Sequence, residues 1–345
     1  LKTFTIGFNE SKYNEAKYAK EIARHLGTDH HEFYINEKDT LNIVPQLCEI
    51  YDEPFGDTSA IPMIFLSNMV KTKVSVALSA DGGDEIFAGY NRYLNGLETY
   101  NKIKSIPLSI RRMGSDILNT FNPKYFNLNG NIYNFNSRYQ KALDLFKAES
   151  ALDVINTYDQ NFSNQELEFL LKNNLPKSVS RYDRNSASLL SELEKMQLFD
   201  YKTFLQDDVL VKVDRATMSA GLEGREPFLD HNIIEFVAQV PDNYKLKNNS
   251  LKYLLKSIAH KHIPKELLNR QKMGFSAPVN IWLQGPLREN LIDLVNPNAL
   301  KKSNIFDINY TMKIRDDLLA GKRSHPQKLW QIFIYQQWHD RWIKG

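Results

Sequence analysis

The sequence predicts an α/β protein, with a parallel sheet near its N-terminus and a mostly helical remainder. Strand-like and helix-like segments alternate through the first part of the chain, at the spacing typical of β–α–β units. From about Gly89 onward, long helical patterns dominate and prolines mark the turns. We therefore expect an α/β part over residues 1–93 and a helical part over residues 94–345.

The α/β part contains three recognisable strands. In order, the expected elements are a strand over Thr3–Phe8, a helix over Asn14–Leu26, a strand over His30–Ile35, a helical stretch that ends near Tyr51, a helix over Ser59–Thr72 and a buried strand over Val74–Ser79. Gly27 is a suitable helix stop, because glycine readily adopts a left-handed backbone. A parallel sheet needs more strands, and the chain begins directly on one. We therefore expect at least one further strand upstream.

Composition excludes several classes of protein. Lys and Arg total 44 against 41 Asp and Glu, so a net charge of +3 gives no electrostatic case for a nucleic-acid partner. The apolar runs are shorter than the ~20 residues of a membrane span, and the N-terminus has no signal-peptide pattern. The single cysteine, Cys48, excludes an internal disulfide and a multi-cysteine zinc site, and its apolar neighbours predict a packed thiol. We expect a soluble, cytoplasmic protein.

The segment Leu78–Tyr93 (LSADGGDEIFAGYNRY) is the most informative motif. An apolar strand runs directly into Ser79–Glu85, and ligands of open α/β sheets bind at the carboxyl ends of strands. Two glycines permit unusual backbone angles. The three carboxylates suit Mg²⁺, which takes one or two carboxylates together with phosphate oxygens. The alternative is an acidic turn that caps a helix starting near Asp84.

Three further segments combine charge with turns. Lys272, in Leu268–Val279, lies ahead of a glycine turn and could stabilise charge on a phosphate, although loop lysines are usually only solvated. Leu210–Asp230 mixes acidic and basic residues with apolar positions at helical spacing, and buried ion pairs are expected for most of them, with a functional role as the alternative. In Tyr51–Met63, one of Asp57, Thr58 and Ser59 is expected to cap the following helix.

Taken in order, several segments resemble the synthetase domain of glutamine-hydrolysing asparagine synthetases. They are FTIGF, GTDHHEF, YDEPFGDTSAIP, LSADGGDEIFAGYNRY, LVKVDRATM, LEGREPFLD and RQKMGFSAPVNIW, and the resemblance runs from Phe4 to about Trp342. It implies an adenine-nucleotide hydrolase fold of the pyrophosphatase-loop (PP-loop) type. It also implies a ligase in which Mg·ATP converts the aspartate side chain to β-aspartyl-AMP and pyrophosphate. Ammonia, supplied by glutamine in the intact protein, then gives asparagine and AMP.

The resemblance assigns roles to individual residues, with ATP and Mg²⁺ as cofactors. Asp81 corresponds to an acidic position that takes part in forming the intermediate and deprotonates ammonia, Lys272 to the lysine that stabilises the phosphate charge, and Glu223 to an acidic residue near the same pocket. The implied nucleotide-binding residues are Ile6, Ser79, Ala80, Gly82 and Gly83, and the implied ligand of Mg²⁺ and pyrophosphate is Asp84.

Three features depart from this family pattern. The phosphate loop S-G-G-x-D-S is absent, and so is the N-terminal glutaminase domain with its nucleophilic cysteine, which Cys48 does not replace. Ala80 and Ala88 stand where the family commonly has glycine, and Asp81 where some members have glutamate. We expect a shortened form of a longer protein that is inactive alone. Its partners would be small-molecule substrates and the missing glutaminase domain, and a homodimer is compatible with the resemblance.

Two alternatives stay open. The acceptor could be a uronic acid or another carboxylate in surface-polysaccharide synthesis, for which a wide, aromatic-lined pocket is expected. A cluster that contacts both the α-ammonium and the α-carboxylate of an amino acid would instead favour aspartate. The other alternative is a non-catalytic binding domain, which the joint presence of Asp81, Asp84 and Lys272 disfavours.

Overall fold

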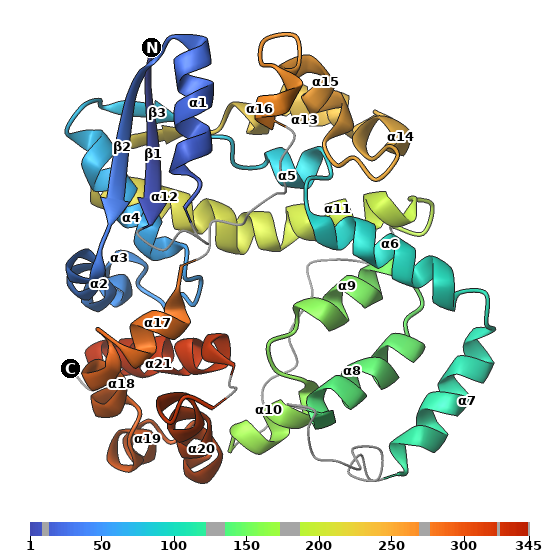
Figure 1. Ribbon diagram of the computed structural model, residues 1–345. Coiled ribbons are helices and arrows are strands. Elements are labelled where there is room, and N and C mark those ends of the chain that lie inside the picture. Colours follow the sequence, from blue (N-terminus) through green and yellow to red (C-terminus); the bar gives the residue numbers. More distant parts are fainter. Residues whose placement is uncertain (9–13, 122–134, 173–186, 269–276, 323–324, 344–345) are drawn as a thin grey trace. The chain divides into compact units, whose positions relative to one another are not determined.

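The described residues fall into two units. The computed structural model describes residues 1–8, 14–121, 135–172, 187–268, 277–322 and 325–343 (Figure 1). Unit 1 comprises residues 1–82, 206–234 and 254–345, and unit 2 comprises residues 83–205 and 235–253. The N-terminal strands and the C-terminal helices thus share a unit, and its boundaries do not coincide with the expected division at residue 93. The assignment of residues 1–93 to nucleotide binding remains a prediction.

Unit 1 begins with a strand–helix–strand unit, as expected. Strand β1 (Lys2–Phe8) pairs in parallel with β2 (Asp29–Ile35), so that Ile6 lies opposite Phe33. Helix α1 (Ala16–Leu26) connects them and lies beside both strands in Figure 1. It ends at Gly27, whose φ of 64° is left-handed, which confirms the predicted helix stop.

A second small sheet in unit 1 differs from the expectation. Strand β3 (Val76–Leu78) pairs in parallel with β4 (Glu223–Arg225), which the sequence pattern did not reveal. The prediction that β3 is buried is wrong, because Val76 is 42% and Leu78 70% exposed. Among the described residues, β4 is the one strand paired with β3, and this short pairing leaves those two side chains uncovered. The class is nevertheless α/β, mostly helical, with small parallel sheets.

Helices make up the rest of unit 1. They are α2 (Glu37–Ile43), η2 (Val44–Gln46), α3 (Leu47–Ile50), α4 (Ala60–Lys71), α12 (Leu210–Ser219), η5 (Pro227–Leu229), α16 (Lys265–Leu268), α17 (Val279–Gln284), α18 (Arg288–Leu294), α19 (Pro297–Ser303), α20 (Ile308–Leu319) and α21 (Pro326–Trp342). Helices α17 to α20 gather around α21, whose Leu329, Trp330 and Phe333 are buried (Figure 1). Cys48, on α3, is 5% exposed, which confirms the packed thiol.

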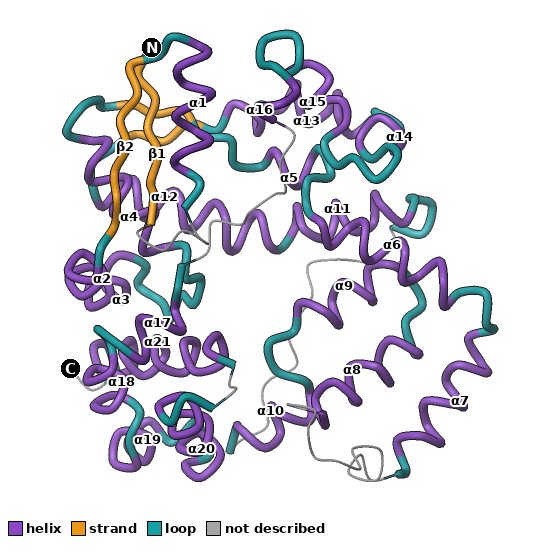
Figure 2. Tube along the Cα trace, viewed as in Figure 1, coloured by secondary structure: helices purple, strands orange, loops and turns teal. Residues whose placement is uncertain are grey.

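The described part of unit 2 consists of helices joined by loops, with no strand (Figure 2). Its helices are α5 (Gly83–Ile86), α6 (Asn91–Ile103), α7 (Leu108–Asn119), α8 (Phe135–Phe146), α9 (Ala151–Asp159), α10 (Asn164–Leu170), α11 (Glu192–Lys202) and α14 (Asp242–Lys245). The π-helix η4 (Leu205–Val209) and helices α13 (His231–Ala238) and α15 (Tyr253–Ala259) cross the unit boundaries. The core of unit 2 includes Tyr93, Ile155 and Met196, all fully buried. None of the described helices is long and apolar enough to span a membrane.

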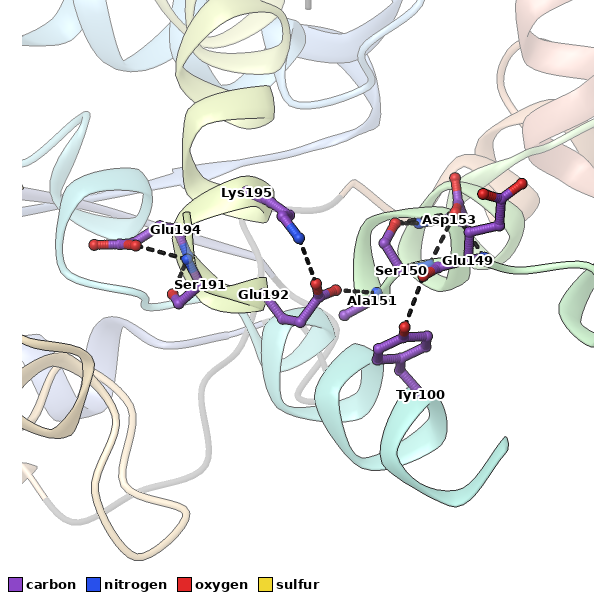
Figure 3. Close-up of polar contacts among 9 residues, drawn as sticks. All are labelled: Tyr100, Glu149, Ser150, Ala151, Asp153, Ser191, Glu192, Glu194 and Lys195. Atoms are coloured by element: carbon purple, nitrogen blue, oxygen red, sulfur yellow. Dashed lines mark hydrogen bonds and ion pairs between the residues drawn. The ribbon is translucent and has the colours of Figure 1, made fainter. Parts of the chain in front are cut away.

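The N-termini of α9 and α11 are joined by polar contacts (Figure 3). Each starts with a capping box, formed by Ser150 with Asp153 and by Ser191 with Glu194. The carboxylate of Glu192 accepts a hydrogen bond from the backbone N–H of Ala151 at 2.6 Å. Since both helix ends are satisfied and tied together, α11 is a firmly placed support within unit 2.

Candidate functional site

The carboxyl end of β3 leads into a turn that holds Asp81. The backbone N–H of Ser79 donates to the carbonyl of Arg225 at 2.9 Å, which continues the pairing with β4. The Ser79 hydroxyl donates to the Asp81 carboxylate at 2.6 Å, and its oxygen accepts from the Asp81 N–H at 3.3 Å. The Asp81 carboxylate is thereby oriented at the strand end, where ligands of parallel sheets bind.

Gly82 allows this turn to pass close to another segment. Its φ is +83°, and an added Cβ would lie 2.2 Å from a methyl carbon of Leu229. Only glycine fits such a combination of left-handed backbone and close approach. The expected unusual backbone angle is therefore confirmed at Gly82, while contact with a nucleotide remains a prediction.

An acidic pocket of about 540 Å³ lies next to this turn, wholly within unit 1. Its lining residues are Gln206, Leu210, Val211, Val213, Asp214, Thr217, Met218, Glu223, Gly224 and Glu226. Three of them are carboxylates, and none is a lysine, an arginine or an aromatic residue. Burial and then the negative charge of Asp81 raise the pKa of Glu226, so Asp81 lies close to this pocket.

Glu223 lines the pocket but does not form a buried ion pair. Its carboxylate is 2.7 Å from the Arg225 guanidinium, and both side chains are more than half exposed. The expectation of buried ion pairs is therefore wrong for these two residues. The segment is a strand and not the expected helix. Glu223 and Arg225 are alternate residues of β4, so their side chains point to the same face, and that face is exposed to solvent.

A buried polar cluster lies elsewhere in unit 1 and does fit the ion-pair expectation. The ammonium of Lys212 is 2.8 Å from the carboxylate of Asp57, which also accepts hydrogen bonds from the N–H and hydroxyl of Ser59 at 2.9 and 2.7 Å. Burial opposes ionisation of Asp57, but Lys212 and Ser59 outweigh it and hold its pKa below the usual value. Burial and the neighbouring Asp57 raise the pKa of Asp208 to about 7. Ser59 occupies the N-cap position of α4, but its side chain makes no capping hydrogen bond.

Asp208 makes folding stability depend on pH. Its pKa of about 7 exceeds the unfolded value of ~3.9, so the folded state alone holds a proton in that window and stability falls as pH rises through it. The pKa of Asp57 is lowered, so its contribution to the stability of the fold is lost only at more acidic pH. We expect Asp208→Asn to flatten the decline in stability between pH 5 and pH 8, measured by urea unfolding. Asp293→Asn, at an exposed carboxylate of α18, is the control; an Asp208→Asn profile parallel to the wild type would contradict the assignment.

Asp84 lies in unit 2, on α5, and is paired with a lysine that sequence reasoning missed. The ammonium of Lys252 is 2.9 Å from Oδ1 of Asp84. Lys252 has a φ of +53°, uncommon for a side-chain-bearing residue. An added Cβ on Gly89 would lie 1.9 Å from Oδ1 of Asp84 and 2.2 Å from Cε of Lys252, so a larger residue there would push these side chains aside. A lysine near a turn gives no sign in the sequence that it is paired. The glycine at position 89 was the available sign that side chains approach the backbone closely there.

The structure brings some of the predicted site residues together. Within unit 1 it places Ser79, Asp81 and Gly82 in one turn beside β4 with Glu223, and it places Ala80 exposed in that turn and Ile6 buried in β1. Gly83 and Asp84 follow in unit 2. Lys272 lies outside the described residues.

Asp84 can contribute to a magnesium site only together with other ligands. No group of three or more His, Cys, Asp or Glu residues that could hold a metal occurs among the described residues. Mg²⁺ commonly keeps one or two protein carboxylates and takes phosphate oxygens and waters for the rest. The single Asp84 carboxylate therefore fits Mg²⁺ that arrives with a phosphate ligand, and does not form a complete protein metal site.

These features define an α/β protein with a candidate ligand site at the carboxyl end of a parallel strand. The chain belongs to the asparagine synthase family, whose model matches residues 1–340. This membership confirms the resemblance to glutamine-hydrolysing asparagine synthetases.

Named relatives agree with the family match. The chain is 29% identical to asparagine synthetase [glutamine-hydrolyzing] 1 of Bacillus subtilis, over 99% of the chain and 52% of that protein. It is 36% identical to the putative asparagine synthetase [glutamine-hydrolyzing] 2 of Methanocaldococcus jannaschii, over 63% of the chain and 40% of that protein. A more distant relative, 23% identical over 91% of the chain, is the amidase chyE of Penicillium rubens. The chain spans about half the length of most of these relatives.

Proposed function

We propose that this chain is the synthetase part of a ligase that uses Mg·ATP to amidate the side-chain carboxylate of aspartate. The reaction passes through β-aspartyl-AMP and yields asparagine, AMP and pyrophosphate. Family membership supports ATP-dependent amide formation in general. The observation that favours aspartate as the acceptor is the acidic pocket beside Asp81.

The lining of this pocket complements an ammonium group. Asp214 and Glu226 supply negative charge, Glu223 is paired with Arg225, and none of the lining residues is basic. Aspartate carries an α-ammonium group, which such a lining attracts. A uronic acid has the same net charge as aspartate but carries no cation for this lining to attract. Sugar pockets also tend to present aromatic faces, and none of the lining residues is aromatic.

Each predicted catalytic group has a physical task in this reaction. A carboxylate is a poor electrophile, and the adenylyl group supplied by ATP provides its leaving group. The carboxylate of Asp81, oriented by the Ser79 hydroxyl, would accept the proton that the attacking ammonia loses. Asp84 would hold Mg²⁺ and the departing pyrophosphate, and Lys272 would stabilise charge on the reacting phosphate.

A nucleotide-binding sheet of the PP-loop type belongs to the same proposal. Exposure of Val76 and Leu78 supports it, because apolar strand residues are normally covered by neighbouring elements in α/β proteins. A further strand of the intact protein, followed by its phosphate loop, would cover them. The cytoplasmic location, the homodimer and the inactivity of the isolated chain stay predictions.

The direct test supplies the intact protein with Mg·ATP, aspartate and ammonia and follows products by mass spectrometry. We expect asparagine, AMP and pyrophosphate together. Asp81→Ala should abolish AMP formation while circular dichroism stays that of the wild type, since the carboxylate itself is required. AMP formed at the wild-type rate by Asp81→Ala would contradict the role of Asp81. If product forms only from a uronic acid, the acceptor is a uronic acid and not aspartate. If no carboxylate gives a product, a non-catalytic domain is favoured.

Lys272 is expected to act mainly on the transition state. Lys272→Ala should lower the rate of adenylation more than the affinity for ATP, measured in single-turnover experiments over a range of ATP concentrations. Equal losses of rate and affinity would instead indicate simple ground-state binding.

A further inference from the structure

Helix α5, which carries Asp84, is too short to hold its own position. It consists of four residues, Gly83–Ile86. The last four carbonyl groups of any helix lack partners within that helix, so a single turn satisfies almost none of its own. Isolated helices of this length do not form in water. The direction of the Asp84 carboxylate is therefore set by groups outside α5.

Gln197 supports α5 beside the backbone N–H of Gly89, which donates to the carbonyl of Asp84 at 2.7 Å. Its side-chain nitrogen donates to the carbonyl of Glu85 at 2.7 Å and to the carbonyl of Ile86 at 2.9 Å. Gln197 is 8% exposed, so water cannot readily replace these bonds. A neutral amide nitrogen carries two hydrogens, one for each carbonyl. One side chain thus binds the last two carbonyl groups of α5.

The support rests on a longer, well-anchored helix. Gln197 belongs to α11, whose N-terminus is capped and tied to α9 through Glu192 (Figure 3). A second contact reaches α5 through Tyr90, whose hydroxyl donates to the Glu85 carboxylate at 2.6 Å. Glu85 itself is 2% exposed. All of these residues lie in unit 2, so α5 is held by its own unit.

We propose that Gln197 is a positioning residue that aims the Asp84 carboxylate by fixing the backbone of α5. This inference rests on the proposed function for the role of Asp84, and on the hydrogen bonds of Gln197 for its physical basis. Outer groups that orient a metal ligand commonly change metal affinity or activity by about 10–100-fold when replaced. Gln197 touches neither substrate nor metal in this assignment.

The test compares Gln197→Met with Gln336→Met in the intact protein. Methionine keeps the length of glutamine and removes both donors. Gln336, on α21 in unit 1, is a matched control: it is 4% exposed and donates to the carbonyl of Leu294 at 3.2 Å. Two quantities are measured: the hydrogen exchange of residues 83–89 without nucleotide, and the Mg²⁺ concentration for half-maximal AMP formation.

We expect Gln197→Met to speed exchange over residues 83–89 about fivefold or more. We also expect it to raise the required Mg²⁺ concentration about tenfold. Gln336→Met should change neither. Unchanged exchange in Gln197→Met would overturn the proposal, and so would faster exchange with an unchanged Mg²⁺ requirement.

Two further measures keep the test decisive. If Gln197→Met does not fold, Gln197→Asn is used instead: it retains an amide but is one methylene too short to reach both carbonyls, and the same two outcomes apply. If the wild type forms no AMP, the proposed function has failed. The exchange rates, measured without ATP, would then still show whether Gln197 fixes α5.

Discussion

Lys212→Met is expected to destabilise the protein by about 3–5 kcal/mol, the usual cost of leaving a buried charge without its partner. Lys212 is 9% exposed, and its ammonium is 2.8 Å from the Asp57 carboxylate. Methionine fills a similar volume, so loss of the positive charge dominates. Asp57 would then face Asp208 without compensation, and one of the two carboxyl groups would have to take up a proton.

Urea unfolding at pH 8 measures this loss. At that pH both carboxyl groups are driven to ionise, and keeping two buried negative charges without Lys212 costs the folded state most. Lys322→Met is the matched control, since Lys322 pairs with Asp317 at 2.9 Å but is largely exposed; it should change stability little. Adding Asp57→Asn to Lys212→Met should recover part of the loss. Equal stabilities for the Lys212 and Lys322 variants would contradict the buried ion pair.

Gly89→Ala is expected to lower Mg·ATP-dependent AMP formation by about 100-fold or more, because it would misplace Asp84, the proposed ligand of Mg²⁺. The new methyl group would lie 1.9 Å from Oδ1 of Asp84 and 2.2 Å from Cε of Lys252, well inside van der Waals contact. Either the Asp84–Lys252 pair separates or the backbone at Gly89 moves. The first outcome displaces the Asp84 carboxylate, and the second shifts the Gly89 N–H, which donates to the carbonyl of Asp84 at 2.7 Å.

Gly114→Ala provides the control for Gly89→Ala. Gly114 also lies in unit 2, within α7, and nothing approaches its added Cβ within 4 Å. Alanine is favoured over glycine inside a helix by roughly 0.5–1 kcal/mol, so this variant should be slightly more stable and fully active. Activity of Gly89→Ala close to that of the wild type would show that Asp84 is not held as described.

The outline of the N-terminal part was predictable because its signals are local. Alternating apolar residues and Gly27 located β1, α1 and β2 to within a few residues. The family match covers residues 1–340, so the order of motifs alone identified the family. In contrast, β4 escaped notice. Three residues of a strand carry too little periodicity, and this strand exists through its pairing with β3.

The sequence by itself determined the family and the acidic strand-end motif, because residue identity and order carry that information. Only the tertiary structure decided which charges meet. It placed Lys212 beside Asp57 and Lys252 beside Asp84, although 155 and 168 positions separate these pairs along the chain. It also exposed Glu223 and brought Gln197 to α5. Such contacts follow from packing between distant segments, which no local pattern records.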